Sequence, residues 1–363
     1  MSIEDHLRKL IDICGPMDLG TYMETCLAHP KFGYYASRDP FGQEGDFVTA
    51  PEMSQIFGEL IGAWVVDLWQ RSGQPAFTLL ECGPGRGTLM ADIMRAATKI
   101  PGFKDAADIH LVEMSSELRK KQQEALKEYD VSWHEDLRNV PGDKPIICIA
   151  NEFLDALPVR QLVKTDDGWL EKCVTIDDSH MLSYTTRPAE PEIVQFLPEY
   201  SEKAEPGAVY EISPERLNWL LFFAQKIKGT TGIALFIDYG YYGKGAGDTF
   251  QAVKNHAYAN PLDGPGTSDL TAHVDFAHIS DVADQSYLSS YGPVTQKDFL
   301  ARLGIELRAQ TLKKDKDKQT QDKIDLDVHR LTHSDEMGTL FKVMAMANQA
   351  FPKPVGFDGS EDG

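Results

Sequence analysis

The sequence predicts an α/β protein built on a doubly wound, Rossmann-like parallel sheet. Short apolar runs between residues 77 and 238 alternate with longer amphipathic segments, as parallel strands joined by crossover helices require. The first run ends in a glycine-rich turn that leads into a helix, and acidic residues follow the next two runs. The chain has 363 residues, of which 42% are hydrophobic, so it can bury one large core or two modest ones. Disorder and small disulfide scaffolds are excluded.

Residues 1–75 are expected to form a helical N-terminal cap. The segment Thr49 to Glu52 has the spacing of a capping box, with Pro51 in the first turn. Apolar residues then recur at helical spacing from Phe57 to Trp69. This pattern predicts one buried amphipathic helix over about residues 51–70.

The sheet core is expected in two parts, residues 76–158 and 205–245, with helices over Leu89 to Ala97 and Leu118 to Tyr129. Its predicted strands are Phe77 to Cys82, Ile109 to Glu113, Val131 to His134, Ile146 to Ala150 and Ile233 to Asp238.

A β-rich insertion is expected at residues 159–204, because two apolar runs flank the turn signal Asp166-Asp167-Gly168. Residues 246–338 form a region of loops and helices in this prediction, on the substrate side of the fold. Residues 339–351 return a last strand, Phe341 to Met346, to the sheet, and residues 352–363 form a flexible tail.

Charge and cysteine usage limit the possible partners. The chain carries 36 Lys+Arg against 56 Asp+Glu, a net charge of −20, which disfavours nucleic acid and anionic membranes. Its five cysteines are scattered without C-x-x-C spacing, so we expect no metal site and no disulfide framework. No apolar run is long enough to span a bilayer, and the start of the chain lacks the pattern of a signal or transit peptide. These features favour a cytoplasmic protein.

The chemistry is expected at the turn Gly83-Pro84-Gly85-Arg86-Gly87. Three glycines at alternate positions let the backbone turn sharply and approach a ligand closely, while the following helix offers free amides. No Gly-Lys-Ser/Thr follows, so this is not a triphosphate-binding loop. The turn indicates a nucleotide-like cofactor.

Two cofactors compete for this turn, a dinucleotide and S-adenosylmethionine (SAM). A dinucleotide favours G-x-G-x-x-G, whereas the spacing here is G-x-G-x-G and Glu81 precedes it. A carboxylate at that position would repel a pyrophosphate but could accept hydrogen bonds from an ammonium group, directly or through water. Glu113, followed by Met114, ends the next strand and could bind both ribose hydroxyls. Glu135 and Asp136 could meet the adenine amino group. SAM is the favoured cofactor.

The chain resembles the MidA-type SAM-dependent methyltransferases. The resemblance runs through nearly the whole chain, and it implies the class I methyltransferase fold. Mitochondrial members of that family are arginine methyltransferases needed to assemble respiratory complex I, so the resemblance implies methylation of an arginine in the quinone-site (NuoD-type) subunit. The segments that carry it are Tyr22 to Leu27, Gly33 to Tyr35, Gly45 to Glu52, Leu79 to Thr88, Asn151 to Pro158, Asp269 to Phe276 and Met337 to Lys342.

The end of the fourth strand is expected to lie beside the transferable methyl group, since open α/β sheets bind ligands at the carboxyl ends of their strands. We predict that Glu152, helped by Asp155, grips the substrate guanidinium there and aims one nitrogen at the methyl carbon. Asn151 is predicted to face the cofactor. The alternative is a plain loop in which Asn151 caps a helix and Asp155 pairs with a structural arginine.

Further residues are weaker candidates for the substrate pocket. Tyr34 and Tyr35 could line a substrate channel, although packing is the favoured explanation for aromatic residues after a glycine. Thr49 and Glu52 already have a role as a helix start, unless Gly45 to Phe47 folds over the cofactor as a lid. His273 and Asp275 are expected on different faces of a helix, so they form no evident dyad.

Three other functions stay open at this point. The chain could methylate a small molecule or another amine, since only the family resemblance favours a protein arginine. It could be an assembly factor that binds SAM without turnover. A nicotinamide oxidoreductase is opposed by the glycine spacing and by Glu81. The sequence gives neither the target arginine, nor the number and symmetry of the methyl groups added, nor the oligomeric state.

Overall fold

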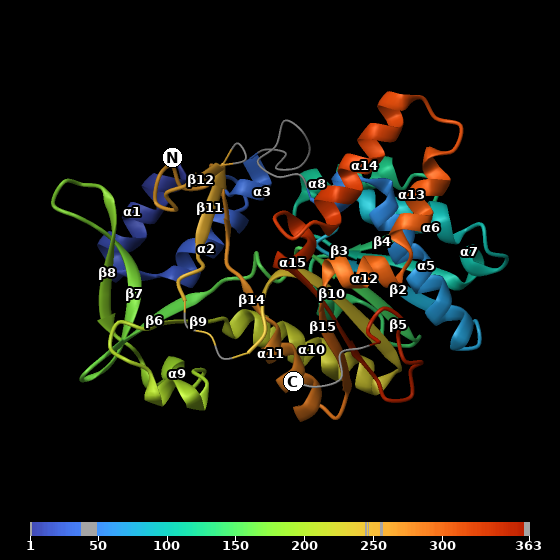
Figure 1. Cartoon of the computed structure of the whole chain (residues 1–363). Helices are drawn as coiled ribbons and strands as arrows, with labels where there is room; N and C mark the ends of the chain where they lie inside the picture. The colour runs from blue at the N-terminus through green and yellow to red at the C-terminus, as the bar shows by residue number, and fades with distance from the viewer. Residues whose placement is uncertain (1, 38–48, 244, 246, 255–256, 359–363) are drawn as a thin grey trace. The chain divides into compact units, whose positions relative to one another are not determined.

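The computed structural model describes residues 2–37, 49–243, 245, 247–254 and 257–358 (Figure 1). Contacts divide the chain into two compact units, each made of three stretches. The accessory unit comprises Met1–Phe47, Asp155–Trp219 and Gly243–His273. The core unit comprises Val48–Leu154, Leu220–Tyr242 and Val274–Gly363. The segment boundaries expected from the sequence follow the chain and stay predictions.

The core unit is built on an eight-stranded sheet, which confirms the predicted fold class. Five strands run parallel in the order β10, β5, β2, β3, β4, and β16 and β15 continue the sheet antiparallel beyond β10. The strands are β2 (Phe77–Cys82), β3 (Ala107–Val112), β4 (Val131–His134), β5 (Ile146–Asn151), β10 (Gly232–Tyr241), β14 (Val274–Asp275, paired with β10), β15 (Ser289–Thr295) and β16 (Phe341–Ala347).

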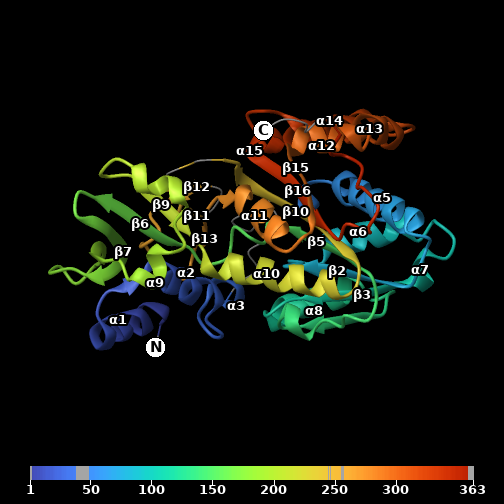
Figure 2. The same ribbon diagram turned by 90° about the horizontal axis from the view of Figure 1, so that it is seen from below.

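The predicted strands are present in this sheet. β2 and β4 have the predicted bounds, while β3, β5, β10 and β16 differ only at their ends. The central strands β2, β5 and β10 are buried along almost their whole length, because helices cover both faces of a parallel sheet. Figure 2 shows α5 (Gln55–Arg71) and α6 (Thr88–Ala97) on one side and α10 (Pro214–Gly229) on the other. Other helices of the core unit are α7 (Phe103–Ala106), α8 (Ser116–Ala125), η1 (Leu137–Asn139), α11 (Phe276–Gln285), α12 (Gln296–Arg302), α13 (Ile305–Lys313), α14 (Lys318–Thr332) and α15 (Met337–Leu340).

The expectation of one continuous helix over residues 51–70 is wrong, because the segment forms two helices, α4 (Ala50–Met53) and α5. Ser54 has an extended backbone, with φ of −152°, and its hydroxyl accepts a hydrogen bond from the Ile56 amide. Ser54 is therefore the cap of the long helix. Within the described part of the chain, Thr49 makes no side-chain cap bond, so the predicted capping box is wrong as well.

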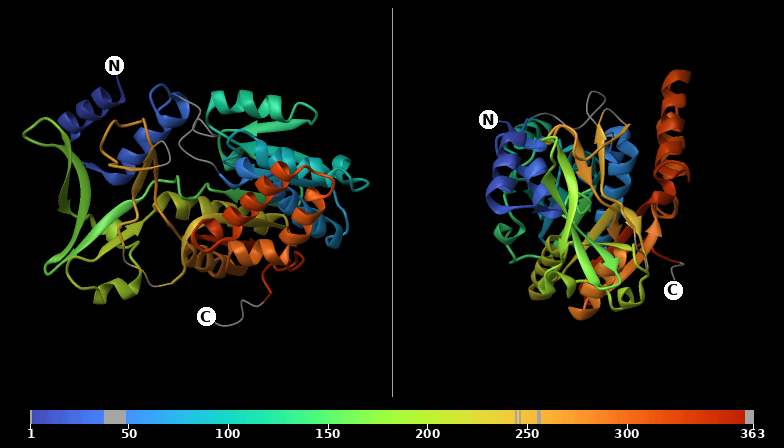
Figure 3. Two further views of the ribbon diagram at one scale, coloured as in Figure 1. Left: turned by 45° about the horizontal axis from the view of Figure 1, so that its top comes forward. Right: turned by 90° about the vertical axis from the view of Figure 1, so that its left-hand side faces the viewer.

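The accessory unit contains the predicted hairpin, formed by β6 (Arg160–Thr165) and β7 (Gly168–Ile176). β7 also pairs with β1 (Met17–Asp18) and with β8 (Leu182–Pro188), and Figure 3 shows β7 and β8 as a curved two-stranded ribbon. β9 (Val209–Ile212) completes this sheet, and β11 (Gln251–Lys254), β12 (Ala257–Ala259) and β13 (Asp269–Thr271) form a smaller one. The helices are α1 (Ile3–Cys14), α2 (Leu19–Ala28), α3 (Tyr34–Ser37), α9 (Pro191–Val194) and η2 (Glu199–Lys203).

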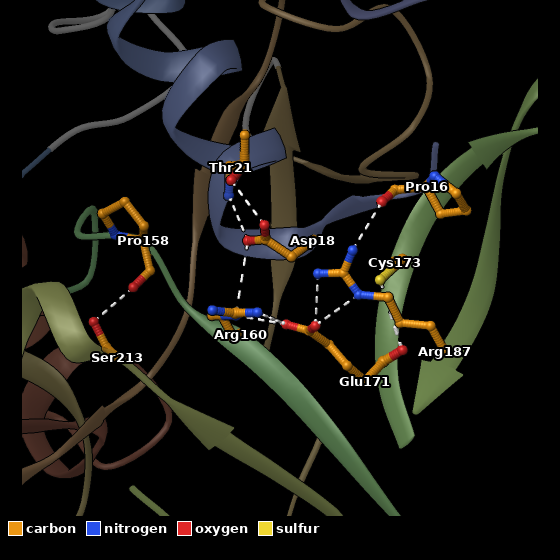
Figure 4. A network of polar contacts seen from close by, with 9 residues as sticks. All are labelled: Pro16, Asp18, Thr21, Pro158, Arg160, Glu171, Cys173, Arg187 and Ser213. Atoms are coloured by element: carbon orange, nitrogen blue, oxygen red, sulfur yellow. Dashed lines mark hydrogen bonds and ion pairs between the residues drawn. The ribbon is translucent and has the colours of Figure 1, made fainter. Parts of the chain in front are cut away.

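A buried ion-pair network ties the strands of the accessory unit together (Figure 4). Glu171 of β7 is fully buried and pairs with Arg160 of β6 and, at 2.9 Å, with Arg187 of β8. Arg187 also donates to the Pro16 carbonyl oxygen, at 3.2 Å. The buried carboxylate of Glu171 thus links β7 to the strands on either side of it, β6 and β8.

Among the helices formed by the described residues, none has the length and apolarity needed to cross a bilayer.

Candidate cofactor and active site

The glycine turn lies at the carboxyl end of β2. Gly83, Gly85 and Gly87 have φ values of +68°, +53° and +84°, in the left-handed region that favours glycine. A Cβ atom on Gly83 would lie 2.9 Å from Cδ2 of Phe153, and one on Gly87 would lie 3.3 Å from Cα of Gln122. Side chains at these positions would therefore strain the backbone and crowd their neighbours.

Two polar acceptors are buried on one face of the sheet beside this turn. Glu81 is opposite Ile149 in the β2–β5 register, and Asn151 is two residues further along β5, so both side chains project from the same face. Among the described residues, Oε2 of Glu81 and Oδ1 of Asn151 have no hydrogen-bond partner. Buried acceptors of this kind require a donor. A ligand ammonium group satisfies that requirement, which fits SAM.

Burial also changes the proton affinity of Glu81. Its side chain is 3% exposed, and this desolvation raises the pKa of the carboxyl to about 8, against the opposing effect of the Met90 backbone. A cation beside Glu81 would favour the ionised form. Cofactor binding and deprotonation are therefore expected to be linked.

The carboxylate of Glu113 is fixed just beyond β3. Its Oε1 accepts from the Ser115 amide at 2.7 Å, and its Oε2 accepts from Nε2 of Gln122 at 3.1 Å. Burial raises the pKa of Glu113, while these two hydrogen bonds act in the opposite direction. Met114, the next residue, is 66% exposed and offers an apolar surface. This geometry suits a sugar hydroxyl beside the acid and a base ring beside the methionine.

Gln122 is a residue that the sequence analysis missed. It is fully buried on α8, its Nε2 also donates to the Gly85 carbonyl oxygen at 2.7 Å, and its Oε1 accepts from Nε1 of Trp133 at 2.9 Å. A signal was available, because Gln122 lies midway between Leu118 and Leu126 on the apolar stripe of that helix. A polar residue in an apolar stripe indicates a buried hydrogen-bonding role.

The two acids after β4 differ in their surroundings. The side chain of Glu135 is 78% exposed and lies 3.9 Å from Arg119. Asp136 accepts from the Arg138 amide at 2.7 Å and pairs with the Arg138 side chain, which holds the pKa of Asp136 below its usual value. Their contact with an adenine amino group stays a prediction, and Asp136 already has a local partner.

The chain leaves β5 in a turn that is held by β10. Glu152 has φ of +48°, which is uncommon for a residue with a side chain. Its amide donates to the Ile237 carbonyl oxygen at 2.8 Å, and the Leu154 amide donates to Oδ2 of Asp238 at 3.0 Å. The neighbouring strand thus stabilises the unusual backbone, a kind of strain that clusters at functional sites.

The side chain of Glu152 lies against the start of α4. Its Oε1 accepts from Nδ2 of Asn151 at 3.2 Å and from the Ala50 amide at 3.4 Å. Glu52 instead accepts from the Thr88 hydroxyl and lies 3.5 Å from Arg86. Glu52 therefore joins α4 to the glycine turn and to α6, in place of the predicted cap. Residues 45–47, the predicted lid, lie outside the described residues.

Some predicted pocket residues belong to the accessory unit. Tyr34 is fully buried in its core, and the Tyr35 hydroxyl donates to Oδ1 of Asp269 at 3.2 Å. Asp155 is also buried there, and its backbone oxygen accepts from the Ala272 amide at 3.2 Å. Because Glu152 belongs to the core unit and Asp155 to the accessory unit, their joint action stays a prediction.

The expectation that His273 and Asp275 lie on a helix is wrong. His273 precedes β14, and its amide donates to the Thr249 hydroxyl at 2.9 Å. Asp275 is the N-cap of α11 and accepts from the Ala277 amide at 3.0 Å. A helix N-cap is a structural role, which explains an aspartate at this position.

The fold and the glycine turn with its flanking acids define a SAM-dependent methyltransferase. Residues 60–294 match the model of a family described as "Putative S-adenosyl-L-methionine-dependent methyltransferase", and the chain belongs to this family. It is similar to the Drosophila melanogaster protein arginine methyltransferase NDUFAF7 homolog, mitochondrial, with 36% identity over 95% of this chain and 84% of the relative. Human protein arginine methyltransferase NDUFAF7, mitochondrial, is 37% identical over 85% of this chain and 74% of that protein.

A solved structure supports the same assignment. A Burkholderia thailandensis protein crystallised with bound S-adenosyl-homocysteine superposes with a TM-score of 0.86 and 28% identity, over 99% of this chain and 94% of that one. The predicted MidA-type resemblance and the predicted cofactor, SAM, are thereby confirmed. The predicted cytoplasmic location is wrong, since it conflicts with relatives that are named as mitochondrial.

Proposed function

We propose that the enzyme transfers a methyl group from SAM to an arginine side chain of a protein, and that this protein is a NuoD-type subunit of respiratory complex I. Relatives named as protein arginine methyltransferases support the arginine. The observation that carries the proposal is Glu152, a carboxylate in a backbone turn braced by β10 at the carboxyl end of the sheet. Ligands of open α/β sheets bind at that edge.

The chemistry of a guanidinium explains why a carboxylate is needed. Its pKa, above about 12, makes the group hard to deprotonate before reaction. The bound cofactor supplies an electrophilic methyl group. Glu152 would accept hydrogen bonds from two guanidinium nitrogens, localise positive charge on them and leave the third more nucleophilic. Asp155 is proposed as a helper in the same task.

Orientation is the main contribution assigned to the protein. Holding the attacking nitrogen in line with the departing sulfur can lower the barrier by roughly 7–11 kcal/mol. The proton can leave after methyl transfer, so the reaction requires no strong general base. The braced turn supports this role because it fixes the carboxylate before the substrate arrives.

The experiment uses SAM with a deuterated methyl group, purified complex I subunits and a cell lysate, followed by mass spectrometry. Label on an arginine of the NuoD-type subunit is the expected result. The E152Q variant should methylate at least about a hundredfold more slowly, because it has lost part of its transition-state stabilisation, while it still binds SAM. The matched control is E124Q, which removes the charge of Glu124 from its exposed ion pair with Lys127 and should keep full activity.

Three results would contradict parts of the proposal. Label found only in small metabolites would exclude a protein substrate. Label on another protein would exclude the complex I subunit as the substrate but would leave protein methylation standing. Complex I assembly that persists in an E152Q strain without methylation would favour an assembly factor that binds SAM without turnover.

A further inference from the structure

Gln122 joins three parts of the cofactor site through one side-chain amide. Its nitrogen donates to the Gly85 carbonyl oxygen and to Oε2 of Glu113, at 2.7 and 3.1 Å, while its oxygen accepts from Trp133. A primary amide has two donor hydrogens, so both are used by these two acceptors. The side chain is fully buried, which makes each of these bonds costly to lose.

We propose that Gln122 is a positioning residue that gives the site its selectivity for a ribose over a deoxyribose. One amide hydrogen fixes the glycine turn and the other fixes the rotamer of Glu113, so the turn and the acid are held at a constant separation. The proposal rests on the placement of the ribose hydroxyls against Glu113. Gln122 itself touches neither the cofactor nor the reacting atoms in this assignment.

The geometry favours this role over simple packing. Leucine or methionine would fill the same place on the apolar stripe of α8 without two donors to align. Oε1 of Glu113 is held by the Ser115 amide, so removal of Gln122 takes away the hydrogen bond that Oε2 accepts and loosens the carboxylate. Hydroxyl recognition depends on orientation, and a rotating carboxylate discriminates less well against a ligand that lacks the hydroxyl.

The test compares the binding of S-adenosylhomocysteine and its 2′-deoxy analogue by calorimetry. In the wild type, the natural ligand should bind at least about tenfold more tightly, the equivalent of one hydrogen bond to a charged group. In Q122M, the preference should fall to within about threefold, and KM for SAM should rise while kcat at saturating SAM changes little. Urea unfolding reports whether the variant remains folded.

Q122E supplies a second variant of nearly the same shape. It places a carboxyl where two acceptors require donors, so binding should weaken at neutral pH and recover as the pH falls, because a proton shared with Glu113 restores one donor. Gln161 provides the matched control. It is a fully buried glutamine of the accessory unit that donates to Glu211 and Asp248, at 2.7 and 2.6 Å. Q161M should lower stability without changing the hydroxyl preference.

Variant E113Q separates the two ways in which the idea can fail. If E113Q removes the preference and both Gln122 variants keep it, Gln122 has no positioning role. If none of the three variants alters the preference, the ribose does not lie against Glu113, and the proposal falls together with that placement.

Discussion

Oδ2 of Asp238 accepts a hydrogen bond from the backbone amide of Leu154 at 3.0 Å. Asp238 lies on β10 and is 1% exposed, while Leu154 follows the turn that carries Glu152. The other carboxylate oxygen accepts from the Tyr239 amide at 3.1 Å. Asp238, which has no proposed role in catalysis, thus helps to fix the turn that carries Glu152.

D238N tests this relationship. The oxygen of an asparagine side chain can accept from only one of the two backbone amides, those of Leu154 and Tyr239. Its NH2 group would then face the other amide, which is also a donor. Stability should fall by about 1–3 kcal/mol, the cost of an unsatisfied buried group. The rate of methyl transfer should fall by about tenfold or more, because misplacement near the reacting atoms reduces the orientation effect. Urea unfolding and single-turnover methylation measure the two effects, and an unchanged rate with reduced stability would restrict Asp238 to a structural role.

The buried carboxyl of Glu81 predicts a pH dependence of stability. Its pKa rises from 4.5 to about 8 on folding, so between these values the folded protein holds a proton that the unfolded chain has lost. Stability therefore falls as the pH rises through this window, and the destabilisation is complete above it. In E81Q that component of the slope should disappear. Urea unfolding of both proteins between pH 5 and pH 8 checks the prediction, and identical slopes would contradict it.

The same carboxyl predicts proton release on cofactor binding. At pH 7 the free protein holds Glu81 mainly protonated, and an ammonium group beside it favours the ionised form. Binding should release a proton, so the calorimetric enthalpy should depend on the ionisation enthalpy of the buffer. E81Q should lack this component. If both proteins show the same buffer dependence, Glu81 does not meet the ammonium group.

The ion-pair network of the accessory unit predicts a stability effect separate from cofactor binding. E171Q removes the charge that Arg160 and Arg187 share, and a broken buried pair costs about 3 kcal/mol. SAM affinity should stay within about twofold, because the glycine turn belongs to the core unit. The control E124Q, which breaks the exposed pair of Glu124 with Lys127, should leave stability nearly unchanged. Equal stability of E171Q and the wild type would contradict this account of the network.

Features set by local sequence could be predicted well. Both β2, which is buried along its whole length, and the short edge strand β4 were predicted at their observed bounds. The glycine turn was predictable because Gly83, Gly85 and Gly87 all adopt backbone angles that other residues avoid. The glycine spacing and the acids beside the turn favoured SAM over a dinucleotide, and the comparisons confirm SAM.

Features set by contacts between residues distant in sequence could not be predicted. Ser54 interrupts a continuous helical pattern, and Glu52 turns to Thr88, 36 residues away, instead of completing a cap. Which partner satisfies a polar side chain depends on the packed fold, and periodicity carries no information about that choice.

The most direct test of the central claim is calorimetric titration of SAM into the wild type and into G85V. Gly85 has φ of +53° in the glycine turn, so valine should fill the space that the cofactor needs and strain the backbone. Gly73, with φ of +91° and open space around its Cβ position, gives the control G73V, which carries backbone strain at the other end of β2. The account predicts SAM binding to the wild type and G73V and none to G85V. Equal binding by all three proteins would show that the cofactor lies elsewhere.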